Sequence, residues 1–275
     1  MRKAVKRKIL VLILSAILLS GLAEAQDTTK KWYAGLGMDV YNAFSQQKNS
    51  MPMKMGYPVF ESVMPELSAG FMWEDQKLHH VKLEIRYSGS LQADDGLGQN
   101  YILQSKASSF FNTRLNYGFY GLLWDPGPFQ IDLGPVGGLE YQRRMLTYKS
   151  GIQERSADVN LFVGPQTRLF YETGKIGIEA YFASMFYIPY LNLGSMKKWD
   201  PAGELITESD YFAFYYRTVF GLSAGYSLNN ADRLGLGVEL DDVVGFANRK
   251  RLFYIDDLVH FRLNKSYRIF IRYYF

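Results

Sequence analysis

Cysteine is absent from the 275-residue chain. Disulfide-stapled folds, thiolate metal sites and cysteine nucleophiles are therefore excluded. An excess of one charge is missing too, because 31 Lys and Arg stand against 27 Asp and Glu, a formal net charge of +4. This mixture does not indicate binding to a polyanion, and we expect no nucleic-acid partner.

Long apolar runs are missing beyond residue 22, so we expect no membrane-spanning helix in the rest of the chain. Hydrophobic residues still make up 48% of the chain and charged residues 21%, which is too apolar for a disordered protein. Tyr, Phe and Gly are abundant, with 21, 19 and 25 copies. These residues are typical of strands and tight turns.

The first 25 residues have the layout of a secretory signal peptide. Residues 1–8 carry five basic side chains, residues 9–22 are apolar, and Ala23-Glu24-Ala25 is a small-x-small cleavage site. A retained signal anchor is the alternative, but the apolar run is short for a membrane span. We therefore expect residues 1–25 to be a signal peptide and residues 26–275 to form one domain.

Apolar and polar residues alternate along this domain with a period of two. In 81–87, for example, Val81, Leu83 and Ile85 share one face, and Lys82 and Glu84 share the other. The same pattern recurs in residues 111–123, 157–171 and 212–228. Soluble proteins mostly use strands of about 5–6 residues. These longer strands are typical of a transmembrane antiparallel up-and-down β-barrel.

Turn spacing predicts how many strands the barrel has. Short polar turns occur at 74–77, 125–128, 173–175 and 229–232, and longer loops at 45–62, 89–106, 148–155, 191–210 and 243–257. Short turns at the periplasmic end and long loops at the extracellular end are the outer-membrane arrangement. Residues 264–266 look like a further turn, but the apolar parity is unbroken across them, so 258–275 is interpreted as one strand. This predicts ten strands, or twelve if residues 56–62 pair separately.

The last strand carries a recognisable signature. Tyr273 and Phe275 end a run in which every second residue is apolar or aromatic. This run resembles the C-terminal assembly signal of bacterial outer-membrane β-barrel proteins. The resemblance implies a place in the bacterial outer membrane, contact with its lipid and lipopolysaccharide, and recognition by the barrel-assembly machinery during insertion.

The inward-facing parity of the predicted strands carries basic and acidic residues in nearly equal numbers. A narrow ten-stranded lumen holding both signs is expected to be a closed, salt-bridged plug, with a small conducting pore as the alternative. The predicted network comprises Lys82, Glu84, Arg86, Arg114, Asp132, Glu140, Arg144, Asp158, Arg168, Glu179, Arg217, Glu239, Asp241, Arg262, Arg268 and Arg272. Several glycines share this parity, and we expect them to relieve crowding where Arg side chains cross: Gly35, Gly37, Gly118, Gly138, Gly164, Gly235 and Gly237.

The extracellular rim holds the candidate catalytic residues. They are Asp210, Asp256, Asp257 and His260, since an Asp–His pair can activate a water molecule for hydrolysis of peptide or lipid. This layout is similar to that of outer-membrane aspartyl-type proteases, although no local motif around the four residues matches. His79 and His80 are adjacent on a strand and point to opposite faces, so they do not indicate a metal site. No cofactor is implied.

Other features point to the membrane and to the loops. The basic triplet Arg249, Lys250 and Arg251 is a candidate contact for lipopolysaccharide phosphates. The leading hypothesis is a non-enzymatic scaffold whose exposed loops serve binding or envelope integrity, with an extracellular ligand that the sequence does not identify. A porin-like channel and a rim hydrolase are the alternatives.

Overall fold

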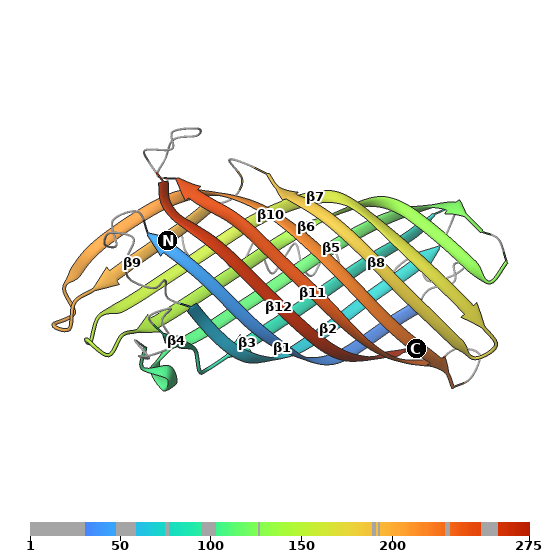
Figure 1. The fold of residues 1–275 in the computed structure, drawn as a ribbon, viewed down its shortest axis with the longest axis horizontal. Coiled ribbons are helices and arrows are strands. Elements are labelled where there is room, and N and C mark those ends of the chain that lie inside the picture. Colours follow the sequence, from blue (N-terminus) through green and yellow to red (C-terminus); the bar gives the residue numbers. More distant parts are fainter. Residues whose placement is uncertain are drawn as a thin grey trace, which may run out of the picture.

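The computed structural model describes residues 31–47, 59–74, 77–94, 103–125, 127–188, 191, 193–228, 232–248 and 258–275. The predicted signal peptide therefore lies outside the described residues. Within them, ten antiparallel strands form a closed barrel, which confirms the predicted fold class (Figure 1). Those strands are β1 (Lys31–Gln47), β2 (Val59–Glu74), β3 (Leu78–Ser88), β5 (Ser109–Trp124), β6 (Phe129–Thr147), β7 (Gln153–Thr173), β8 (Ile176–Tyr187), β10 (Leu205–Ser227), β11 (Arg233–Asn248) and β12 (Leu258–Tyr274).

The barrel closes between its first and last strands. β1 pairs with β2 on one side and with β12 on the other, so that Tyr33 lies opposite both Gly70 and Tyr274. β12 runs unbroken through residues 264–266, as its parity predicts. Lys265 lies on its exposed, outward-facing side. The C-terminus and the short turns lie together at the right-hand end in Figure 1, which is the periplasmic end in barrels of this kind.

The extracellular end is more ordered than the sequence predicts. Residues 193–199, expected in a loop, form β9 (Leu193–Trp199), which pairs with both β7 and β10 and continues the sheet beyond the barrel (Figure 1). The prediction of an open loop over 191–210 is therefore wrong, because two neighbouring strands supply backbone partners for a polar segment whose own pattern is weak. β4 (Gln92–Asp94) likewise pairs with the start of β2, followed by the short 3-10 helix η1 (Ser105–Ala107).

The number of strands is ten in the closed barrel and twelve when the strands outside the barrel are counted as well. Ten strands make the closed ring, and the described part of the chain holds two additional short strands, β4 and β9, which lie outside that ring. A separate strand over residues 56–62 is not among them. Residues 59–62 belong to β2, where they pair with β1 on one side while residues 59–61 pair with β4 on the other.

The outer surface of the barrel is apolar where a membrane would surround it. One row of cross-strand neighbours runs Leu67, Leu36, Ile271 and Leu236 over four adjacent strands, and each is more than half exposed. A soluble protein rarely leaves such a contiguous surface in water. The barrel is therefore transmembrane. Among the described residues, no helix has the length and apolarity needed to cross a membrane.

Aromatic side chains gather on the outside near the periplasmic end. The Trp32 and Phe71 rings lie 4.3 Å apart, and the Trp73 ring stacks on the imidazole of His79 at 4.6 Å. Tyr226, Tyr273 and Phe275 are exposed at the same end. Aromatic belts of this kind lie at the membrane–water interface.

The interior holds two apolar clusters besides its charges. One lies near the extracellular mouth and brings Leu91 and Leu103, from the predicted loop 89–106, against Tyr41, Met64 and Phe110. We call this the mouth cluster. The other joins inward side chains of β6, β7, β8, β10 and β11, among them Val136 and Val219. The lumen is thus apolar along part of its wall, a feature that the charge pattern alone does not predict.

Candidate functional site

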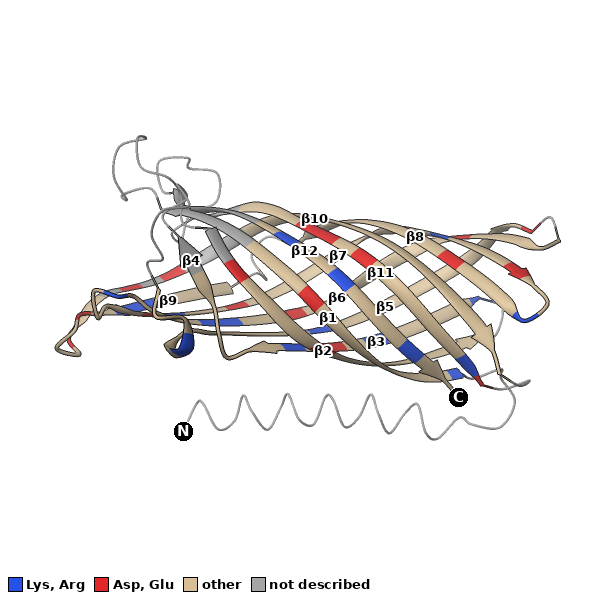
Figure 2. Cartoon of the chain, turned by 60° about the horizontal axis from the view of Figure 1, so that its bottom comes forward, with Lys and Arg blue, Asp and Glu red and all other residues tan. Residues whose placement is uncertain are grey.

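Charged residues lie on several strands about midway along the barrel (Figure 2), and their side chains pair in a layer across the lumen. It forms because strand alternation directs every second residue inward, and the register sets these residues at one height. Asp39, for instance, lies opposite Arg268, which in turn lies opposite Glu239. We call this layer the septum. Its members in the described chain are Asp39, Glu66, Lys82, Glu84, Arg86, Arg114, Glu140, Arg217, Glu239, Asp241 and Arg268.

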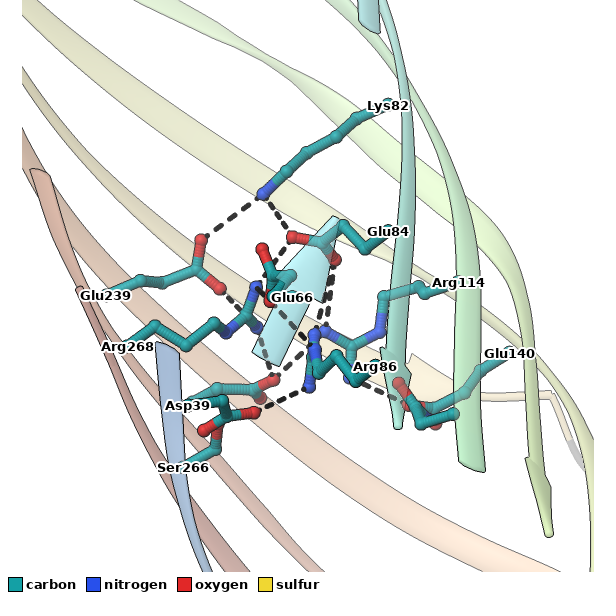
Figure 3. A network of polar contacts seen from close by, with 12 residues as sticks. Asp39, Glu66, Lys82, Glu84, Arg86, Arg114, Glu140, Glu239, Ser266 and Arg268 are labelled. Carbon is teal, nitrogen blue, oxygen red and sulfur yellow. Dashed lines mark hydrogen bonds and ion pairs between the residues drawn. The ribbon is translucent and has the colours of Figure 1, made fainter. Parts of the chain in front are cut away.

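Arg268 is the centre of the septum (Figure 3). Its guanidinium lies 2.6 Å from Glu84 Oε1, 2.5 Å from Glu239 Oε1, 3.1 Å from Asp241 Oδ2 and 3.3 Å from Glu66 Oε2. The residue is only 2% exposed. Four carboxylates therefore share one buried cation. Such contacts stabilise the folded state only while all partners remain in place.

Three further arginines join the walls of the barrel to this centre. Arg86 Nε lies 2.9 Å from Glu66, and Arg114 Nη2 lies 2.7 Å from Glu140. Arg217 forks onto Asp241, with Nε 2.7 Å from Oδ1 and Nη2 2.8 Å from Oδ2. Bidentate pairing of this kind fixes geometry as well as charge.

The septum lies between two hollows in the lumen. The periplasmic one, which we call the chamber, encloses about 690 Å³, a figure that includes space open to solvent, and Lys82, Glu239 and Arg217 line it. The extracellular one encloses about 280 Å³ on the same basis, with Arg114 and Asp241 among its lining residues. The Arg217–Asp241 pair therefore separates the two hollows. The mouth cluster lies above the extracellular hollow, since Tyr41 and Phe110 belong to the cluster and also line this hollow.

Other predicted lumen residues lie outside the septum. Arg168 pairs with Glu179 at 2.8 Å on the periplasmic side, and Asp132 accepts a hydrogen bond from Gln130 at 2.9 Å. Arg144, Asp158 and Arg272 are buried. The side chain of Arg262 lies outside the described residues. Two septum members, Asp39 and Glu66, were missed in the sequence, although each lies on the inward parity of its strand and could have been found by extending the period-two pattern to residues 31–74.

Of the four candidate catalytic residues, the structure describes Asp210 and His260, and these two lie apart. Asp210 is exposed in β10, opposite Ser195 of β9. His260 lies two strands away, level with Ala213 of β10. Two strand spacings and three residues of rise place the Cα atoms of Asp210 and His260 roughly 14 Å apart. Asp256 and Asp257 lie outside the described residues, as do Arg249, Lys250 and Arg251. In the described part of the chain, no group of three or more His, Asp and Glu residues could hold a metal ion.

The two adjacent histidines, His79 and His80, lie in different environments. His79 is on the outer face, where its Nδ1 lies 2.8 Å from the Tyr117 hydroxyl. His80 lines the chamber, with Nε2 2.8 Å from the hydroxyl of Tyr33. Their opposite orientation follows from strand alternation, as the sequence predicts.

The closed strand order and the apolar exterior define a bacterial outer-membrane β-barrel fold. The outer membrane protease OmpT from Escherichia coli is similar in structure, with a TM-score of 0.60 and 10% sequence identity over 92% of this chain and 99% of that one. A major outer membrane protein from Thermus thermophilus aligns with a TM-score of 0.41 and 11% identity, over 87% and 99% of the two chains. No protein-family model matches the sequence, and no curated protein gives a significant sequence match. At these identities the likeness concerns the fold alone.

Proposed function

We propose that this protein is a non-enzymatic scaffold of the bacterial outer membrane, with a closed lumen and a recognition surface at its extracellular end. The observation that carries the proposal is the septum, because paired, buried charges fill the middle of a narrow barrel. The mouth cluster adds an apolar barrier above it, where Leu91 is fully buried. An ion crossing the lumen would have to displace both.

The recognition surface would include the sheet extension formed by β9 with β7 and β10. Lys197 pairs with Glu208 at 2.6 Å, and the Arg155 guanidinium lies 5.2 Å from the ring centre of Trp199. These contacts between strands hold the extension in one shape. Exposed segments on a rigid scaffold are where binding residues are commonly found.

The membrane partners follow from the same proposal. Lipid would cover the apolar belt, and Tyr273 and Phe275 would form the signal read by the barrel-assembly machinery. Arg249, Lys250 and Arg251 would meet lipopolysaccharide phosphates beyond the extracellular end of β11. A rim hydrolase has less support, because Asp210 and His260 are not neighbours.

Single-channel recording in planar bilayers tests the closed lumen. We expect the purified wild-type barrel to give no steady openings. The double variant Arg217→Ala, Leu91→Ala should conduct, because loss of the Arg217–Asp241 pair joins the chamber to the hollow beyond the septum, and loss of the Leu91 side chain opens the apolar barrier above it. Retention of heat-modifiable migration on gels shows that each variant has folded.

Lys265→Ala is the matched control, because it removes a basic side chain from the outer face of β12. It should remain as silent as the wild type. Steady wild-type openings of defined size would overturn the proposal and make the protein a small porin.

A further inference from the structure

The chamber carries one more positive charge than its own contacts neutralise. In the described part of the chain, four basic residues line it, Lys82, Arg168, Arg217 and Arg272, with three acidic ones, Glu84, Glu179 and Glu239. The first three bases have carboxylate partners. Lys82 pairs with Glu239 at 3.5 Å, Arg168 with Glu179 at 2.8 Å, and Arg217 with Asp241 at 2.7 Å.

Arg272 is the exception. It is 5% exposed, and no carboxylate of the described residues forms an ion pair with it. Its guanidinium lies over the rings of Phe270 and Tyr33, 3.9 and 5.3 Å from their centres. Its Nε and Nη2 have no hydrogen-bond partner in the described part of the chain. Burying a charged donor without a hydrogen-bond partner lowers the stability of the folded protein, unless a bound ligand supplies that partner.

The chamber also has an apolar wall. Val136, Ala183, Met185 and Val219 line it from β6, β8 and β10. In the closed strand order β6 is five strands from β12, so Val136 lies on the wall opposite Arg272. The chamber therefore presents a cation on one wall and an apolar surface on the other.

We propose that the chamber binds a small organic carboxylate with a compact apolar body. Arg272 would hold the carboxylate through its planar fork, and the body would pack against the apolar wall. The ligand would enter from the periplasmic end, because the septum lies on the other side. This assignment does not depend on whether the septum conducts, so the two proposals can fail separately.

Isothermal titration of the detergent-solubilised full barrel with propionate tests this assignment. Propionamide is the neutral probe of the same shape. We expect propionate to bind the wild type, and propionamide to bind at least about tenfold more weakly, because it lacks the charge that Arg272 pairs. Arg272→Gln should weaken propionate binding by about tenfold or more.

Arg143→Gln is the matched control, because it removes an exposed guanidinium from the outer face of β6. Propionate affinity should be unchanged in this variant. Absence of propionate binding at millimolar concentration would overturn the proposal, as would equal binding of propionamide or undiminished binding to folded Arg272→Gln. If Arg272→Gln does not fold, the comparison of propionate with propionamide on the wild type decides alone.

Discussion

Replacing Arg268 with methionine should lower the free energy of unfolding by about 3–5 kcal/mol, the usual effect of removing one partner from a buried ion pair. Methionine keeps much of the side-chain volume but none of the charge. The septum already holds six acidic and five basic residues in the described chain. The variant leaves four carboxylates without their shared cation. Equilibrium unfolding in guanidinium chloride, followed by tryptophan fluorescence, measures the change.

Two companion variants separate charge from packing. Lys265→Met, on the exposed side of the same strand, should change stability by less than about 0.5 kcal/mol. Adding Glu239→Gln to Arg268→Met removes one of the excess negative charges and should recover about 1 kcal/mol or more. A loss below about 1 kcal/mol for Arg268→Met alone would show that the septum contributes little to stability.

Gly164→Ala should destabilise the barrel by about 3 kcal/mol, because the site has no room for a side chain. A Cβ atom at Gly164 would overlap the backbone carbonyl oxygen of Ser184 on β8, and backbone cannot swing aside as a flexible side chain can. The β7–β8 pairing leaves out Gly164 and Pro165 while keeping the same register on either side. The strands approach closely at this point.

Gly121→Ala is the control for this effect. A Cβ atom at Gly121 would lie 3.9 Å from the carbonyl oxygen of Leu133, an ordinary contact. The variant should be neutral or slightly stabilising, since alanine has less conformational freedom to lose in a strand. Urea or guanidinium unfolding of the two variants side by side measures the difference. Equal stabilities would mean that β7 and β8 can separate at Gly164 without cost.

The sequence correctly predicts that several glycines face the lumen, but it explains only part of why glycine is needed there. The sequence predicts that they make room for crossing arginines, and at Gly35 a Cβ atom would indeed lie 2.9 Å from Arg272 Cγ. At Gly118 and Gly237, however, the space is filled by the rings of Tyr120 and Phe270. Packing of aromatic rings over strand glycines is a known device in β-barrels. Strand parity says that a glycine faces the lumen but not which neighbour covers it.

The sequence alone determined the class of fold, because few architectures besides a membrane barrel can accommodate strands this long with a strict two-residue period. It also determined which faces carry charge, as with Lys82 and Glu84, since parity is a local property of the chain. Only the tertiary structure decided the partners. Arg268 meets Glu84 across 184 residues of sequence, Arg272 has no carboxylate partner among the described residues, and 193–199 joins a sheet. These outcomes depend on strand register and barrel closure, which bring together residues that no local pattern relates.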